Sequence, residues 1–126
     1  MDLYREQILD HYKHPRNFGH LDGADVSSEE VNVSCGDRVA IDIRFGTDKS
    51  GKRIVKEIRF VGEGCAINQA SASMLTEKIT GMGVAEILAL GTPDIEAMLG
   101  ATLTPSRVKC AVLPLEVVQK AIQTVR

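Results

Sequence analysis

The 126-residue sequence contains no apolar run that approaches the roughly 18 residues of a membrane span. It also lacks long basic blocks, and its formal net charge is −2. Both features argue against the broad basic surface of a nucleic-acid-binding protein. The N-terminal segment is charged and amphipathic, whereas a secretory signal peptide would be apolar. We therefore expect a cytoplasmic protein that binds neither membranes nor nucleic acids.

Cysteine is scarce, because only Cys35, Cys65 and Cys110 are present. An odd number of cysteines cannot pair completely in disulfides within one chain, which favours a reducing compartment. The chain is 44% hydrophobic and 25% charged, and it shows no internal repeat. This size and composition suit one compact domain, and we expect a single domain over residues 1–126.

The first segment predicts a helix followed by a loop. Apolar residues recur at helical spacing from Met1 to His14, and Pro15 ends the helix because the residue before a proline is pushed out of the helical region. The polar residues through Ser28 predict a loop. The histidines of this region form no cluster with another metal donor, so we expect them at the surface or at a helix end rather than at a metal. They are His11, His14 and His20.

From Val31 onward the apolar period changes to two, which is typical of strands with one buried face. Polar turn residues over 46–51 predict a hairpin between the second and third strands. Such strands imply an antiparallel sheet with one face on the core. The residues expected on buried faces are Val31, Val33, Val39, Ile41, Ile43, Phe45, Ile54, Ile58 and Phe60.

Helical spacing returns at Cys65 and continues to the end of the chain. Met74 lies on the first apolar stripe and is predicted to be a core residue. Pro114 is predicted to interrupt the last helix. The order of helix, strands and helices predicts an α+β domain: a three-stranded antiparallel sheet with helices packed on one side. The predicted helices run from Cys65 to Gly81, from Val84 to Leu90, from Thr92 to Gly100 and from Thr104 to the C-terminus.

The cysteines lie in settings that suit metal chemistry. Cys65 follows two glycines at a predicted helix N-terminus, where the backbone N–H groups and the helix dipole favour the thiolate. Soft thiolates select zinc, Cu(I) or iron–sulfur chemistry, and a tetrahedral site needs four donors. Asp37 is the best fourth candidate, because Gly36 lets the backbone turn both Cys35 and Asp37 toward one point. Alternatively, the cysteines are small buried residues, Cys110 above all, and Asp37 caps a turn.

Motifs spread over most of the chain together resemble the IscU/NifU/SufU family of iron–sulfur cluster assembly proteins. They are residues 4–19 (YREQILDHYKHPRNFG), 35–37 (CGD), 64–67 (GCAI), 70–74 (ASASM) and 107–111 (RVKCA). The resemblance implies a SufE/NifU-like fold and a scaffold that accepts persulfide sulfur from an IscS- or SufS-type cysteine desulfurase. Such a scaffold builds a [2Fe–2S] cluster on its three cysteines and passes it to apo-proteins, and zinc often occupies the site in isolated members. Carried over to this sequence, the ligands are Cys35, Asp37, Cys65 and Cys110.

Three positions depart from the family pattern. Lys109 stands where IscU-type members have histidine, as in the SufU type, yet the chain lacks the SufU-type insertion between the second and third cysteines. Val33 replaces the usual proline two residues before Cys35. Residues 103–107 only loosely resemble the segment by which IscU-type scaffolds engage a dedicated Hsp70 chaperone, so the sequence does not predict that partner.

Three functions follow from these features. The leading prediction is a cluster-assembly scaffold that is not an enzyme. The sequence does not decide whether this scaffold forms a homodimer. The alternative is a zinc-dependent sulfurtransferase in which Cys110 accepts the persulfide and Lys109 helps to keep that thiol ionised. A closed structural zinc site is the third, and it is less favoured because such sites use four strong ligands.

Overall fold

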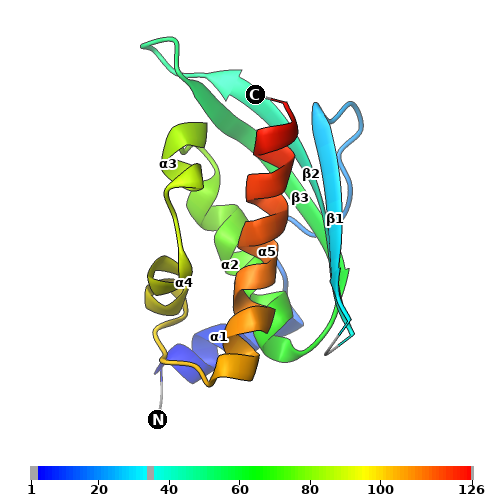
Figure 1. Cartoon of the computed structure of the whole chain (residues 1–126), viewed down its shortest axis with the longest axis vertical. Helices are drawn as coiled ribbons and strands as arrows, with labels where there is room; N and C mark the ends of the chain where they lie inside the picture. Colours follow the sequence, from blue (N-terminus) through cyan, green and yellow to red (C-terminus); the bar gives the residue numbers. More distant parts are fainter. Residues whose placement is uncertain (1–2, 34–35, 126) are drawn as a thin grey trace.

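A layer of helices covers one face of an antiparallel β-sheet (Figure 1), as the computed structural model shows for residues 3–33 and 36–125. In this part of the chain the sheet has three strands in the order β1-β2-β3. The predicted α+β class is therefore confirmed. The elements are α1 (Leu3–Lys13), β1 (Val26–Asn32), β2 (Asp37–Thr47), β3 (Arg53–Glu63), α2 (Ala66–Ile79), α3 (Val84–Leu88), α4 (Thr92–Leu99) and α5 (Pro105–Thr124).

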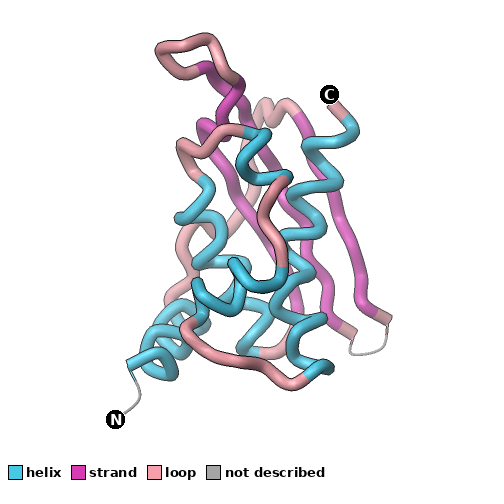
Figure 2. Tube along the Cα trace, turned by 60° about the vertical axis from the view of Figure 1, so that its left-hand side comes forward, coloured by secondary structure: helices cyan, strands magenta, loops and turns pink. Residues whose placement is uncertain are grey.

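The core lies between the sheet and the two long helices, α2 and α5 (Figure 2). Alternate residues of β2 point to it because side chains of a strand alternate between the two faces. Met74 is 5% exposed and belongs to this core, as predicted. The fully buried large side chains include Ile41, Ile43, Ile58, Phe60, Leu75, Ile79, Leu115 and Ile122.

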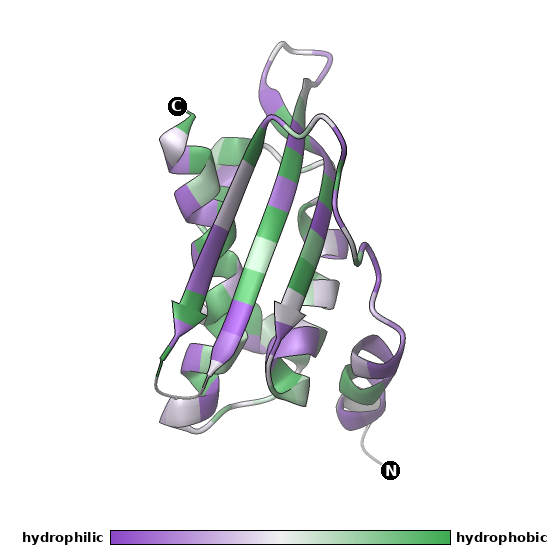
Figure 3. Ribbon diagram, turned by 90° about the vertical axis from the view of Figure 1, so that its right-hand side faces the viewer, coloured by the Kyte–Doolittle hydropathy of each residue, from purple (hydrophilic) through white to green (hydrophobic). Residues whose placement is uncertain are grey.

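Strand β1 differs from the prediction in both its start and its orientation. It begins at Val26, inside the segment predicted as loop. Val31 and Val33 are 49% and 89% exposed, so their predicted burial is wrong. Val31 pairs with Arg38 on the outer face of the sheet, whereas Glu30 pairs with the buried Val39. Figure 3 shows this outer face, where hydrophilic and hydrophobic residues alternate along the strands.

The reversed orientation of β1 follows from its neighbour α5. Glu30 lies on the side of the strand that meets this helix, and its carboxylate accepts a hydrogen bond from the Lys120 ammonium at 2.5 Å. The carboxylate of Glu30 on this half-buried face is therefore paired with a side chain of α5. Two alternating valines form too short a pattern to decide which face of β1 is buried, and the contacts with α5 decide it instead.

A register shift changes the inward residues of β3. Arg44 pairs with Glu57 and Phe45 pairs with Val55, so Lys56 is an extra residue in the strand. Such a β-bulge reverses which residues face inward. Val55 is consequently fully buried, and Ile54, predicted to share a face with Ile58, is only half-buried.

Helix α1 packs against α2. The segment after α1 lies along the edge of β3 that does not pair with β2. The N–H of Phe60 donates to the carbonyl of Asn17 at 2.9 Å, and the N–H of Gly19 donates back to Phe60 at 2.8 Å. His14 and His20 are exposed as predicted. His11 occupies the other predicted setting, a helix end: it lies in the last turn of α1 and is 6% exposed, with Nδ1 2.8 Å from Ser73 Oγ on α2.

Candidate metal centre

Three potential metal donors meet at the lower end of the molecule in Figure 1, where β2 begins and β3 ends. One ligand atom each from Asp37, Cys65 and Cys110 lies within 4.8 Å of the others. Asp37 opens β2, Cys65 is the N-cap of α2, and Cys110 lies in the second turn of α5. Residues far apart in the sequence are thus brought together by the packing of three elements. The fourth predicted ligand, Cys35, lies outside the described residues.

Asp37 links the sheet to the start of α2. It is 2% exposed, and its Oδ1 accepts a hydrogen bond from the backbone N–H of Cys65 at 3.2 Å. A carboxylate at a helix N-terminus is stabilised by the helix dipole and by the N–H groups that have no helical partner. This contact holds the carboxylate beside the Cys65 thiol.

The junction between β3 and α2 leaves no room for a side chain. A Cβ atom on Gly64 would lie 2.5 Å from Asp37 Oδ1 and 2.9 Å from Asn68 Oδ1. A Cβ atom on Gly62 would lie 2.7 Å from the backbone oxygen of Arg38. Such distances are sterically forbidden. The two glycines before Cys65 therefore allow the donors to approach one another closely.

Cys110 is held from two sides. It is 7% exposed, and its Sγ lies 3.6 Å from the carbonyl oxygen of Ser106, one helical turn earlier. Its own carbonyl accepts a hydrogen bond from Asn68 Nδ2 at 3.0 Å. Cys65, by contrast, is exposed. The centre thus combines one accessible thiol with one buried thiol.

Asn68 and Ser71 were not predicted to take part in the site. Both are fully buried on the side of α2 that faces α5, where Ser71 Oγ donates to the carbonyl of Ala111 at 2.6 Å. The sequence feature that could have indicated their role is Pro114, because a proline has no backbone N–H to donate within α5. The structure keeps α5 continuous through this proline, so its predicted interruption of the helix is wrong.

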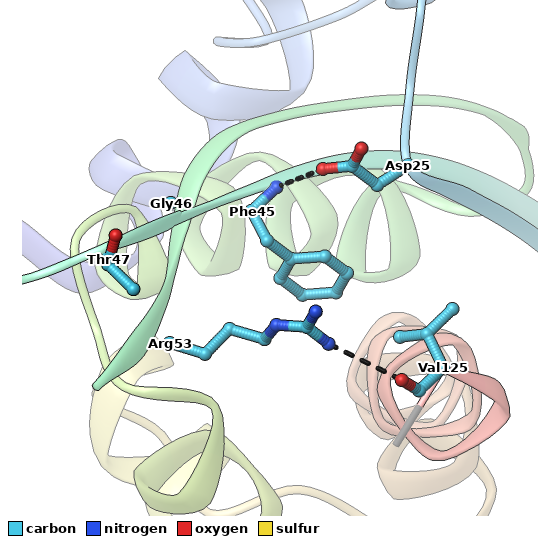
Figure 4. A pocket seen from close by; sticks show the side chains of 6 residues that line it. All are labelled: Asp25, Phe45, Gly46, Thr47, Arg53 and Val125. Atoms are coloured by element: carbon cyan, nitrogen blue, oxygen red, sulfur yellow. Dashed lines mark hydrogen bonds between the residues drawn. The ribbon is translucent and has the colours of Figure 1, made fainter. Parts of the chain in front are cut away.

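Two other hollows of the surface are lined by residues other than the three donors. A hollow of about 430 Å³ opens at the hairpin end of the sheet (Figure 4). There the Arg53 guanidinium lies 4.9 Å from the centre of the Phe45 ring and donates to the carbonyl of Val125 at 3.4 Å. A second hollow, of about 340 Å³, lies between β1 and α5 and is lined by Lys109, Val33 and Glu116 among others. The first holds no cluster of metal donors or nucleophiles among its lining residues, so it does not extend the site.

The family model of the NifU-like N-terminal domain matches residues 3–126. The chain belongs to this family. Proteins similar to this chain include a sulfurtransferase and cluster assembly scaffolds. It is 36% identical to the zinc-dependent sulfurtransferase SufU of Bacillus subtilis strain 168, with 95% of this chain and 89% of the relative covered. It is also 33% identical to the iron–sulfur cluster assembly scaffold protein IscU of Escherichia coli K12, with 94% and 91% covered.

Solved structures of NifU-family proteins share the fold. FiSufU of Fervidobacterium islandicum AW-1, described as an iron–sulfur cluster assembly scaffold for the SUF system, superposes with a TM-score of 0.69 at 29% identity, covering 93% of this chain and 94% of that one. The N-terminal part of a NifU-like protein from Brucella abortus superposes with a TM-score of 0.72, covering 98% and 94%. At 17% identity, this second likeness shows the fold alone. Within residues 3–33 and 36–125, none of the helices combines the length and apolar character needed to cross a membrane.

The chemistry of the donors fits a thiophilic metal. Two cysteine sulfurs and one carboxylate oxygen within 4.8 Å of one another can bind one Zn²⁺ or Fe²⁺ ion with only local movement. A carboxylate binds soft metals less strongly than a thiolate does. The described donor set therefore suits a metal that is loaded and released.

Proposed function

We propose that this NifU-family protein is an iron–sulfur cluster assembly scaffold. In this proposal Cys35, Cys65 and Cys110 bind a [2Fe–2S] cluster as cargo, and Asp37 completes the site. The sulfur comes as persulfide from a cysteine desulfurase, and the finished cluster passes to apo-proteins. The protein then acts in the cytoplasm as a carrier rather than as an enzyme. The observation that carries the proposal is the meeting of Asp37, Cys65 and Cys110 within 4.8 Å at one end of the molecule.

The burial of the donors supports a carrier. Cys65 is exposed, so a partner protein can reach a cluster bound to it. Cys110 and Asp37 are 7% and 2% exposed and hold the inner side of the site. Asp37 is also the donor that is easiest to replace, because a carboxylate binds soft metals less strongly than a thiolate does. The thiolates therefore bind the metal firmly, and the carboxylate is the donor that can be exchanged.

Anaerobic reconstitution tests this function. Purified protein is incubated with iron, cysteine and a cysteine desulfurase, and the absorbance of a [2Fe–2S] centre is expected to develop. Cys65→Ala and Cys110→Ala should each abolish most of that absorbance, whereas Lys49→Ala in the distant hairpin should not change it. If the wild-type protein stays colourless under conditions that load a known scaffold, the proposal is wrong.

A second function is favoured by two observations: the 36% identity to the B. subtilis sulfurtransferase and the lysine before Cys110. In this version Cys35, Asp37, Cys65 and Cys110 would hold Zn²⁺, and a competing ligand from the desulfurase would leave the Cys110 thiolate free to react. The Cys110 thiolate then attacks the outer sulfur of the desulfurase persulfide. A new S–S bond forms at Cys110, the persulfide S–S bond breaks, and the desulfurase cysteine leaves as a thiolate. No external oxidant or reductant is needed.

Stimulation of a desulfurase separates the two functions. The sulfurtransferase version predicts that Zn²⁺-loaded protein accelerates alanine release from cysteine and that Cys110→Ala abolishes this effect. Mass spectrometry should detect one added sulfur atom on Cys110 without any cluster absorbance. Full stimulation by Cys110→Ala would exclude this mechanism.

A further inference from the structure

Helix α5 contains Pro114, which removes one of the internal hydrogen-bond donors of the helix. In an α-helix the N–H of each residue donates to the carbonyl four residues earlier. Pro114 has no N–H and lies four residues after Cys110. The Cys110 carbonyl therefore receives no bond from position 114. Nevertheless, α5 runs without interruption from Pro105 to Thr124.

Asn68 of α2 supplies the missing donor. Its Nδ2 donates to the Cys110 carbonyl at 3.0 Å, in a buried contact between residues 42 positions apart. The Asn68 side chain is fully buried, so the position is costly for an amide unless it is hydrogen-bonded. One turn further along α2, Ser71 Oγ donates to the neighbouring carbonyl of Ala111 at 2.6 Å. Helix α2 thus holds α5 through two adjacent carbonyl groups, and the first of these belongs to a proposed metal ligand.

The Oδ1 atom of Asn68 accepts a hydrogen bond from Gln69 Nε2 at 3.3 Å and lies beside Gly64. This atom lies 2.9 Å from the place of a Cβ atom on Gly64, and Asp37 Oδ1 lies 2.5 Å from that same place. Asn68 also belongs to the first turn of the helix that Cys65 caps. One side chain therefore contacts the backbone of Cys110 while it lies beside Gly64, Asp37 and the start of the Cys65 helix.

We infer that Asn68 is a positioning residue that sets the spacing of the Cys65 and Cys110 thiols. Its amide takes the place of the N–H that Pro114 lacks, so the position of Cys110 depends on α2 instead of on α5 alone. With an ordinary residue at 114, α5 would satisfy this carbonyl internally and could move relative to α2 without losing the bond. The inference deepens the proposed function, since it concerns the same donors.

Co²⁺ binding to the metal-free protein provides the test. Thiolate-to-cobalt charge-transfer bands report bound cysteines, and the d–d bands report the geometry of the site. Asn68→Ala is expected to weaken Co²⁺ binding about tenfold or more, as is typical when an outer hydrogen-bond partner of a ligand is lost, and to shift the d–d bands. Ser71→Ala is the matched control. It removes a bond to the carbonyl next to Cys110, and its Co²⁺ affinity should stay within about twofold of the wild type.

Pro114→Ala provides the rescue, because alanine restores the N–H that can donate to the Cys110 carbonyl. Comparing Asn68→Ala with the wild type and then with the Pro114→Ala background completes a double-mutant cycle. In the Pro114→Ala background, Asn68→Ala should change Co²⁺ affinity by less than about threefold. This comparison remains decisive if Asn68→Ala alone does not fold, because the double variant should fold. A loss of about tenfold in both backgrounds, or wild-type affinity and spectrum in Asn68→Ala, overturns the inference.

The Co²⁺ measurement is independent of cluster assembly. If the wild-type protein binds Co²⁺ through its cysteines and Asn68→Ala weakens that binding, the inference holds even where reconstitution yields no cluster. If the wild type assembles a cluster and Asn68→Ala binds Co²⁺ unchanged, only the inference fails. The two proposals therefore have separate outcomes.

Discussion

His11 lies in the last turn of α1, in agreement with the predicted helix-end position, but it is buried against α2 rather than at the surface. Its Nδ1 contacts Ser73 Oγ, and this hydroxyl oxygen also accepts the backbone N–H of Arg16 at 2.9 Å. Burial first, and then the positive charge of Arg16, lower the pKa of His11 below its usual value. Glu77, whose carboxylate lies 3.7 Å from Nε2, opposes this shift only in part. The structure therefore favours neutral His11.

The lowered pKa of His11 predicts a loss of stability in acid. As the pH falls, the unfolded chain binds a proton at His11 near pH 6.5, before the folded protein does. The free energy of unfolding of the metal-free protein should therefore decrease between about pH 7 and pH 5. His11→Asn removes this titrating group, so its free energy of unfolding should fall less steeply over the same range. Urea denaturation at several pH values measures the difference.

The exposed His14 provides the control for this experiment. His14→Asn should keep the pH dependence of the wild-type protein. An unchanged slope in His11→Asn would contradict the proposed role of His11.

Single residues also show where sequence reasoning about the site succeeded. Cys65 was predicted at a helix N-terminus because two glycines end the strand before it, and the structure places it at the N-cap of α2. The contribution of Asn68 was missed, because a lone polar residue on a helix is usually solvated. Asn68 has a role only because folding brings it close to α5, where Pro114 lacks an N–H. The local sequence does not show that these two helices pack together.

At the scale of elements, regular spacing predicted the hairpin of β2 and β3 and all four helices after β3. Apart from the start of β1 and the predicted interruption at Pro114, the errors concern the face that a strand presents. In β1 the inward residues include Ser28 and Glu30, because α5 satisfies polar groups there. In β3 the bulge at Lys56 shifts the alternation by one residue. Neither effect leaves a signal in the local sequence.

The corrected orientation of β1 predicts a contrast between two matched substitutions. Val31 is on the outer face and Val39 is fully buried, so Val→Thr places a hydroxyl in water at one position and in the core at the other. Val31→Thr should change the free energy of unfolding by less than about 0.5 kcal/mol. Val39→Thr should lower it by roughly 1–3 kcal/mol, because the hydroxyl displaces an apolar contact. Denaturant melts measure both, and equal losses would contradict the assigned faces.

At the scale of the whole molecule, the apolar core and the metal centre occupy different places. The hydrophobic cluster draws its residues from β2, β3 and the helices α2 to α5, and it includes none of the three described donors. Unlike a small zinc-dependent fold, this domain can therefore fold before it binds metal.

Metal removal should consequently weaken the protein without unfolding it. A site saturated to 100 times its dissociation constant contributes about 2.7 kcal/mol, which corresponds to a fall in Tm of roughly 10 °C for a domain of this size. Chelator-treated protein should still unfold in one cooperative transition in a thermal scan. Loss of the cooperative transition would favour the structural zinc site instead.

Strands β2 and β3 each contain 11 residues. The turn that joins them therefore lies at the opposite end of the sheet from the metal donors. At about 3.3 Å per residue, the turn over residues 48–52 lies roughly 30 Å from Asp37. A fluorescent label or surface tether attached at this turn would leave the donors facing outward. Cluster uptake from one solution and cluster release into the next could then be measured on the immobilised protein.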